Sequence, residues 1–461
     1  GDVTYWADSD ANSQGGIYLN YGTSANTTSI ATSGGNITMG GGADLATGSA
    51  YGYGADATYQ HGINIDAYST LNAGAGAVTL RGATTASRND YIIGLRISGT
   101  GVSVTGGNLS FVGNASTAVS QSNQGAWGTA IINGASVTGS GTIDITGTGG
   151  GNTSSGNNYG VLLWNPVTGS GAVTVTGRGG GGSGSNNYGI SVSNNTVVKS
   201  ASGGLTLTGT AGSGSNSQGI YFGGSTLGDN AQSGAITLNS DAVNFSGTNA
   251  FTTTGTVTAR PISNNFSGTL NWSNLTLGSS VSGLTIGKDI GSTAHTDTVA
   301  IGSAATIAGP INVYAGNINL GAGLRSTLAG SGISLYATNN INTTGTGLTV
   351  QTAGGNILFN SNVTGAGGSI DLDRMSLLSS GGNITLGGGL NGTDYAVGTA
   401  TSNMPTYVGQ SKYKGVFLQA ATLNAAGGNI SIKGKGWQGA NWNDLVTDYY
   451  AIGVDVVGYT A

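Results

Sequence analysis

The chain of 461 residues contains no cysteine, no glutamate and only four prolines. Without cysteine, a disulfide scaffold, a thiolate zinc site, an iron–sulfur cluster and a cysteine nucleophile are all excluded. The good helix formers Glu, Lys and Arg are nearly missing, which argues against a helical protein. Collagen is excluded too, because glycine has no strict period of three and proline is scarce.

Charged residues are equally scarce: they make up 7% of the chain, and the net charge is −5. Nucleic-acid binding through counterion release needs clustered lysine and arginine, whereas the 13 basic residues are scattered. We therefore expect no nucleic-acid partner. No run of about 18 apolar residues occurs, so the sequence predicts no membrane-spanning helix. Charge-driven disorder is excluded as well, because 37% of the residues are apolar.

Glycine, by contrast, accounts for 89 residues and takes part in a repeat of about 30 residues between positions 94 and 240. Each repeat holds an alternating strand, whose leading apolar residues are Leu109, Ile143, Val173, Leu205 and Ile236. A second short apolar strand centres on Val104, Val137, Val167, Val197 and Leu227. A third strand opens at Gly94, Gly128, Gly160, Gly189 and Gly219.

Three short strands of constant phase in each repeat predict a three-sided parallel β-helix, that is, a solenoid. Apolar residues alternate with Ser and Thr within each strand, so that one face is buried. A single repeat cannot bury this face alone, but stacked repeats form a continuous core. A propeller would need four-stranded blades of about 40–45 residues instead. We therefore predict an all-β fold that forms a single elongated rod.

We divide this predicted rod into three stretches. Residues 1–240 form a β-helix with coils of about 30 residues. Residues 241–282 repeat least clearly and are interpreted as an irregular coil region. Residues 283–461 continue the β-helix with shorter phrases, such as GPINVYAGNINLG.

A second repeat operates on a longer scale. GGNITMGGG at 34–42 returns as GGNITLGGG at 381–389, and TLNAGAGAVTLRG at 70–82 returns as TLNAAGGNISIKG at 422–434. These matches define a tandem period of about 350 residues, whose second copy starts near residue 355.

The first phrase, GDVTYW, shows no signal-peptide pattern and matches GNILFN in the second copy. We interpret the chain as processed or as a piece of something longer. We expect it to continue covalently into a tandem fibre; end-to-end stacking of copies is the alternative.

The phrases GGNITMGGG, GGNISIKGKG, SGISLYATNNINTTGTGL and GAGGSIDL resemble those of filamentous-haemagglutinin-like large exoproteins, a family of bacterial β-strand-repeat adhesins. The resemblance covers essentially the whole chain and implies a right-handed parallel β-helix shaft. It also implies a secreted, extracellular protein of the cell surface, exported with an outer-membrane secretion partner. The implied function is structural or adhesive contact between cells or with surfaces, as in a biofilm, with glycans or a host or neighbouring cell surface as partners. The amino-terminal secretion domain of that family is not recognisable.

One loop has the spacing of a calcium site. Asp8, Asp10 and Asn12 follow the D-x-D-x-N pattern of an EF-type loop. However, Ser13 stands where that loop needs glycine, and Leu19 stands where it needs a bidentate glutamate. We therefore predict a polar turn, with calcium as the alternative and no other metal or cofactor.

Candidate catalytic groups are isolated. Asp371 and Asp373 share one face of a strand, with Arg374 on the other, and paired carboxylates serve polysaccharide hydrolysis. No further acid accompanies them, so we interpret them as a solvated face. His61 and His295 lie in different predicted coils and cannot share a metal or a triad. We predict no enzyme; a polysaccharide-degrading or -binding β-helix protein is the alternative.

Two surfaces are candidates for ligand contact. The only basic concentration comprises Lys412, Lys414, Lys433 and Lys435, near Trp437 and Trp442. It is either a patch for acidic glycans or a means of preventing edge pairing. Trp127, Tyr159 and Tyr188 precede strand-opening glycines, so we expect them to stack at one corner. We interpret that stack as packing between coils, with a sugar platform as the alternative.

Overall fold

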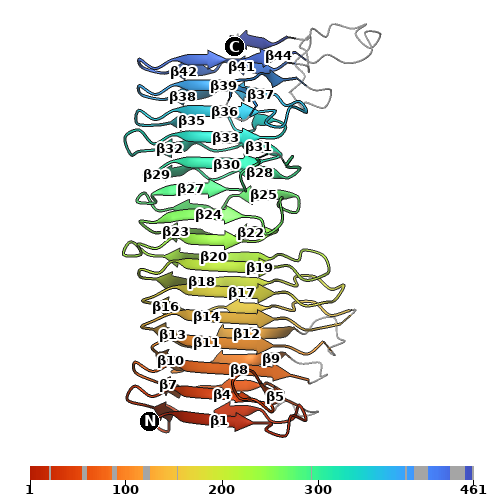
Figure 1. The fold of residues 1–461 in the computed structure, drawn as a ribbon, viewed down its shortest axis with the longest axis vertical. Coiled ribbons are helices and arrows are strands. Elements are labelled where there is room, and N and C mark those ends of the chain that lie inside the picture. Colours follow the sequence, from red (N-terminus) through yellow and green to blue (C-terminus); the bar gives the residue numbers. More distant parts are fainter. Residues whose placement is uncertain are drawn as a thin grey trace. The chain divides into compact units, whose positions relative to one another are not determined.

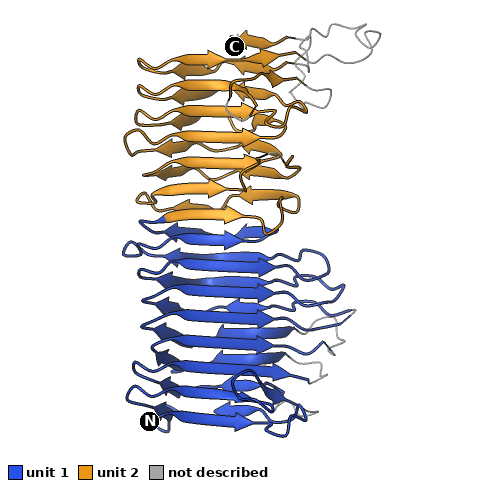
Figure 2. Cartoon of the chain, in the orientation of Figure 1, with its two compact units in different colours: residues 1–255 blue, residues 256–461 orange. Residues whose placement is uncertain are grey.

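The structure, a computed structural model, describes residues 1–19, 22–53, 60–85, 91–117, 125–152, 154–291, 293–389, 392–398, 414–436 and 452–458. Every regular element within these ranges is a β-strand, as the composition predicts. No helix able to cross a membrane occurs in them. The chain divides into two compact units, residues 1–255 and 256–461 (Figure 2).

The strands of unit 1 form three parallel ladders (Figure 1). The first ladder contains β1 (Val3–Ala7), β4 (Ile37–Gly41), β8 (Val78–Thr84), β11 (Leu109–Asn114), β14 (Ile143–Thr148), β17 (Val173–Arg178), β19 (Leu205–Thr210) and β21 (Ile236–Asn239). The second contains β2 (Ile17–Leu19), β6 (Ile63–Ile65), β9 (Ile92–Ser98), β12 (Ala126–Ile132), β15 (Val161–Leu163) and β22 (Val243–Ser246). The third contains β3 (Thr28–Ala31), β7 (Ser69–Asn72), β10 (Ser103–Gly106), β13 (Ser136–Gly139), β16 (Val167–Gly169) and β23 (Asn249–Thr252). The long strands β18 (Ile190–Ser200) and β20 (Ile220–Gly228) belong to both the second and the third ladder, and β5 (Ala50–Gly52) pairs with β8.

The first ladder follows the register that the sequence predicts. Its five leading residues, from Leu109 to Ile236, are paired strand by strand, and all are fully buried. A serine, threonine or aspartate follows each of them, so one face of each strand lies in the core, where the buried apolar area stabilises the stack.

The predicted second apolar strand needs one correction. Val198, and not Val197, pairs with Val167 and Leu227. The reason is a bulge in β18, where Asn194 and Asn195 adopt left-handed φ angles of 65° and 56°. The extra residue shifts the alternation by one position, which the sequence period alone does not reveal.

Unit 2 repeats the arrangement with three ladders of its own. The first contains β24 (Thr256–Arg260), β27 (Gly283–Ile286), β30 (Ile311–Ala315), β33 (Ile333–Ala337), β36 (Ile357–Ser361), β39 (Ile384–Gly388) and β43 (Ile430–Ile432). The second contains β25 (Thr269–Trp272), β28 (Thr298–Ile301), β31 (Asn317–Leu320), β34 (Ile341–Thr343), β37 (Ile370–Asp373), β41 (Val416–Gln419) and β45 (Val454–Val457). The third contains β29 (Ala305–Ile307), β32 (Leu324–Ser326), β35 (Leu348–Gln351), β38 (Met375–Leu378) and β42 (Thr422–Asn424). The remaining short strands are β26 (Leu275–Leu277), β40 (Ala396–Val397) and β44 (Gly434–Lys435), of which the last two pair with each other.

The segment from β36 to β45 has the same local fold as the segment from β1 to β9. The register Ile357–Ile384–Ile430 in unit 2 matches Val3–Ile37–Val78 in unit 1. The antiparallel bridge between Gly368 and Val397 matches the bridge between Gly15 and Tyr51. Equivalent positions of the two segments can therefore be compared residue by residue.

Candidate functional site

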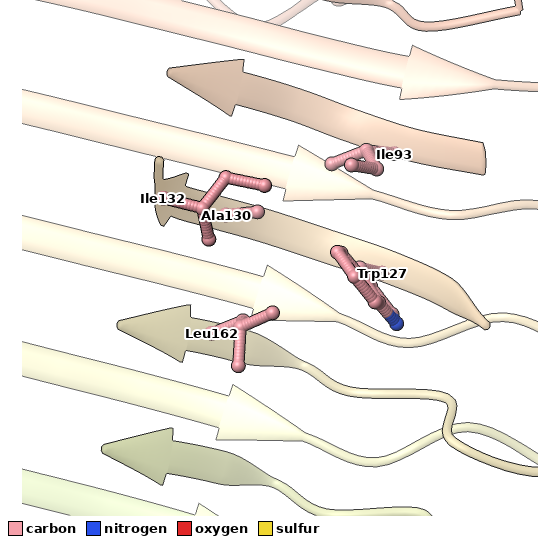
Figure 3. Close-up of a cluster of buried hydrophobic side chains, with 5 residues drawn as sticks. All are labelled: Ile93, Trp127, Ala130, Ile132 and Leu162. Carbon is pink, nitrogen blue, oxygen red and sulfur yellow. The ribbon is translucent and has the colours of Figure 1, made fainter. Parts of the chain in front are cut away.

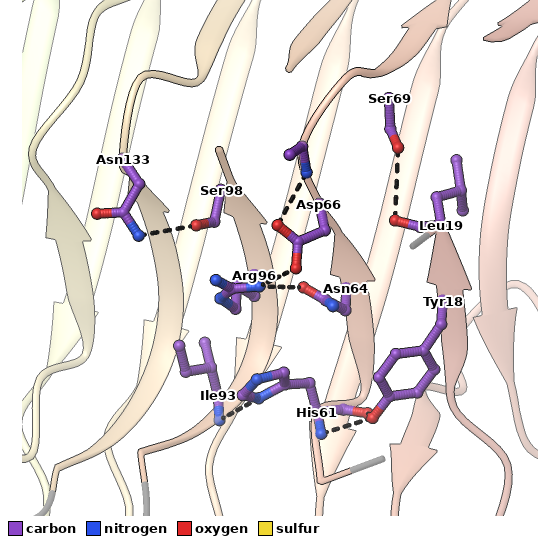
Figure 4. Close-up of polar contacts among 11 residues, drawn as sticks. Tyr18, Leu19, His61, Asn64, Asp66, Ser69, Ile93, Arg96, Ser98 and Asn133 are labelled. Atoms are coloured by element: carbon purple, nitrogen blue, oxygen red, sulfur yellow. Dashed lines mark hydrogen bonds and ion pairs between the residues drawn. The ribbon is translucent and has the colours of Figure 1, made fainter. Parts of the chain in front are cut away.

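A row of outward-facing polar side chains crosses the second ladder of unit 1. Tyr18, Asn64 and Arg96 lie in register on β2, β6 and β9 (Figure 4). Arg96 donates from Nη1 to Asn64 Oδ1 at 2.8 Å and forms an ion pair with Asp66 Oδ2 at 2.9 Å. Burial opposes ionisation of Asp66, but hydrogen bonds from the Ala67 amide and from Arg96 outweigh it, so the pKa of Asp66 is lowered.

His61 lies beside this row with its side chain partly buried. Its Nδ1 accepts a hydrogen bond from the Ile93 amide at 3.2 Å, while its backbone amide and carbonyl both bond the Tyr18 hydroxyl. Burial, helped by the positive charge of Arg96, lowers the pKa of His61 to about 3. The imidazole therefore acts here as a hydrogen-bond acceptor and not as a base at neutral pH.

The same row becomes apolar further along unit 1. Ala130 on β12 follows Arg96 in register, and Leu162 on β15 follows Ala130. Both belong to a buried cluster with Ile93, Trp127 and Ile132 (Figure 3). The outward side of this ladder is thus covered, and polar groups on it need partners within the protein.

In unit 2 the equivalent row is Asp371, Phe417 and Asp455, on β37, β41 and β45. Lys414 stands two residues before β41, as His61 stands two residues before β6. Its Nζ lies 2.6 Å from Asp455 Oδ2 and 3.7 Å from the centroid of the Phe417 ring. The Lys414 side chain is only 2% exposed. The Lys414 amine is therefore enclosed over an aromatic ring, in contact with a carboxylate whose side chain is 21% exposed.

Asp371 completes this group as a buried carboxyl. The prediction that it forms part of a solvated face is wrong: the residue is 4% exposed, and its Oδ1 has no hydrogen-bond partner. Burial, together with the negative charge of Asp373, raises the pKa of Asp371 to about 7, against the opposing effect of Lys414. Asp373 itself is bonded by Arg374, which turns back toward it with a left-handed φ of 46°.

The predicted basic surface is only partly described. Lys412, Trp437 and Trp442 lie outside the described residues. Lys433 donates from Nζ to the Thr393 carbonyl at 2.8 Å, and Lys435 is exposed on β44 at the edge of a cavity of about 590 Å³. Lys414 is enclosed, so it does not belong to an exposed surface.

The loop with calcium-like spacing is a turn closed by its own side chains. The Asp8 carboxylate accepts from the amides of Ser13 at 3.1 Å and Gln14 at 3.3 Å. Asn12 Oδ1 also accepts from the Gln14 amide, and Asn12 Nδ2 donates to Asp10 Oδ2. These bonds are typical of a polar turn.

The second copy forms the same turn with an uncharged side chain. Asn362 corresponds to Asp8, with a φ of 53° against 52°, and its Oδ1 accepts from the Gly367 amide at 2.6 Å. A neutral amide thus replaces the carboxylate. Across the described ranges, no group of three His, Cys, Asp or Glu side chains could hold a metal ion.

The predicted aromatic stack is confirmed and is longer than expected. The Trp127 and Tyr159 rings stack at 5.8 Å, and the Tyr159 and Tyr188 rings at 5.3 Å. Tyr91 adds to one end at 4.8 Å, and Tyr221 adds to the other at 4.7 Å. Because the inner rings cover each other's faces, the stack favours packing between strands over sugar binding.

Searches of the chain against protein-family models, curated proteins and solved structures gave no match. Sequence reasoning missed the pairing of Lys414 with Asp455. The signal for it is in the internal repeat, where these two residues replace His61 and Arg96.

Proposed function

We propose that the chain is a structural and adhesive shaft segment of a secreted bacterial surface fibre. The observation that carries this proposal is the in-register stacking of three parallel ladders in each unit, with the apolar row inside. Such stacking has no intrinsic limit, since each repeat contacts only its neighbours. The recurrence of the β1–β9 fold in β36–β45 supports a tandem array.

We also propose that the three ladders close into a right-handed three-sided β-helix. In unit 1 the chain visits the ladders in a fixed order, as β8, β9 and β10 are followed by β11, β12 and β13. Crossover connections between parallel strands of one sheet are right-handed in nearly all proteins. The fixed order supports a repeating coil, and the rule supports its right-handed sense.

Labelling of intact producing cells with an antibody against the chain tests the surface location. The proposal expects labelling of unbroken cells and loss of the signal after brief external proteolysis. Labelling that appears only after lysis would contradict it. Beads coated with the purified chain should adhere to cells or to glycan-coated surfaces more than beads coated with an inert protein.

A second candidate, polysaccharide cleavage, is favoured by one observation. Asp371 has a raised pKa, as a general acid requires, and Asp373 follows it on the same strand. Its enclosure limits access for a polymer, so we rank this function second. Turnover of polysaccharides that is lost in Asp371→Ala or Asp373→Ala would favour it over the adhesive shaft.

A further inference from the structure

We propose that Lys414 and Asp455 form an intramolecular amide, an isopeptide bond that links the segment preceding β41 to β45. The two side chains are already joined as an ion pair at 2.6 Å. This contact brings the amine nitrogen next to the carboxyl group that it would attack, and such positioning lowers the barrier of a condensation. Strand pairing between β41 and β45 holds both residues in place.

The step is a condensation that needs no outside reagent. A proton passes from the ammonium to the carboxylate within the pair, which leaves a neutral amine and a carboxylic acid. The amine lone pair then attacks Cγ, the C–N bond forms, and the C–OH bond breaks. The water molecule that leaves consists of one carboxyl oxygen and two hydrogens that came from the ammonium group. No electron is gained or lost.

Enclosure favours this reaction in two ways. Taking the Lys414 ammonium out of water costs free energy, and proton transfer to Asp455 replaces the enclosed charge by a neutral amine. Phe417, which is 2% exposed, lies beneath Lys414 Nζ and shields the amine from water on that side. The reactants also need no further ordering, because the fold has positioned them already.

Asp371 supplies a second carboxyl on the other side of Phe417. It lies in register with Phe417 on β37, and its ionisation is sensitive to the charge of Lys414. With a pKa of about 7, Asp371 is present in both protonation states near neutral pH. We assign it as a positioning residue whose charge state influences the transfer of the proton from Lys414 to Asp455. The charged groups that act on it are Asp373 and Lys414; Asp373 is paired with Arg374, and Lys414 with Asp455.

Unit 1 contains a natural comparison. There the same positions hold Tyr18, Asn64 and Arg96, with His61 in place of Lys414. None of these side chains can form an amide with its neighbour. They are paired through hydrogen bonds instead. The reactive pair is therefore specific to the second copy.

Mass spectrometry of the purified, folded full chain tests the proposal. After incubation at neutral pH, the expected intact mass is lower than the sequence mass by one water, and a tryptic digest contains a branched peptide joining Lys414 to Asp455. An intact mass equal to the sequence mass, with separate Lys414 and Asp455 peptides, would overturn the proposal. This result does not depend on any variant folding correctly.

Variants test whether the loss of water occurs at Lys414 and Asp455. Lys414→Arg keeps the positive charge and Asp455→Ala removes the electrophile; both should retain the full sequence mass. Loss of water that persists in both variants would assign it to another site and refute the linkage. Asp371→Asn should slow formation of the branched peptide at least tenfold and remove its dependence on pH near 7. An unchanged rate and pH profile would exclude the assigned role of Asp371.

Discussion

At the scale of single residues, one backbone position carries different chemistry in the two copies. His61 and Lys414 occupy equivalent places before a strand, yet one is a neutral acceptor and the other is a paired amine. The difference comes from the neighbouring strand, which brings Arg96 to the first and Asp455 to the second. The fold therefore tolerates exchange of these groups provided that each buried group finds a partner.

The raised pKa of Asp371 predicts a pH-dependent stability. Because the folded value of about 7 lies above the unfolded value of 3.8, the folded chain binds more protons between these limits, and stability falls as pH rises through this window. Asp371→Asn removes this loss. We expect the variant to gain on the order of 2–4 kcal/mol at pH 8 and little at pH 4.

Urea unfolding of the full chain at both pH values measures this effect. Asp144→Asn, on the exposed face of β14, is the matched control for the substitution itself. A gain for Asp371→Asn that is equal at the two pH values would contradict the assigned pKa.

Buried asparagines predict a second residue-scale effect. Asn187 is fully buried; its Oδ1 accepts from the Asn158 amide at 3.0 Å, and its Nδ2 donates to three carbonyls, including that of Ser213. Asn187→Ala removes these bonds and takes the acceptor away from the buried Asn158 amide, and a buried group left unpaired costs about 1–3 kcal/mol. The urea midpoint should fall clearly, whereas Asn114→Ala, exposed at the end of β11, should leave it nearly unchanged. Equal midpoints for the two variants would contradict the role of the buried amide.

At the scale of elements, strand register is the property that the sequence predicts best. Leu109 and its counterparts combine two signals, alternation within a strand and recurrence from repeat to repeat, and both agree. The predicted pairing of Val197 is wrong because a bulge adds one residue to the strand. The apolar pattern does not reveal the bulge, since Val197 and Val198 are both valines.

The bulge itself predicts a matched pair of variants. Asn195 has a φ of 56°, a conformation that costs a β-branched residue roughly 1–2 kcal/mol and glycine almost nothing. Asn195→Val should lower the thermal midpoint of unfolding, while Asn195→Gly should have a midpoint close to that of the native chain. A valine variant as stable as the glycine variant would show that the bulge is absent.

Register is also accessible to cross-linking, because the chain contains no cysteine of its own. Thr146 and Thr176 are exposed and in register on β14 and β17, so a cysteine pair at these positions should form a disulfide readily. A pair at Asp144 and Thr176 is displaced along the strand and should not close under the same conditions. Closure of the displaced pair in preference to the first would refute the register.

At the scale of the whole molecule, the all-β class and the long parallel sheets could be predicted because composition, alternation and repeats agree. The candidate site could be predicted only in fragments. Asp371 was visible as an acid on a strand, but its burial depends on what covers the outward face of the sheet. Lys414 and Asp455 lie in different repeats, and only strand pairing between β41 and β45 brings them together.

The most direct test of the proposed shaft is an experimental density map of the purified chain, by crystallography or electron cryo-microscopy. We predict that within each unit the three parallel ladders close around one apolar core, with right-handed coils and with Leu109 and Ile143 stacked inside. Open sheets or antiparallel pairing of the main strands would contradict the β-helix, and with it the proposed shaft, whereas left-handed coils would contradict the proposed handedness.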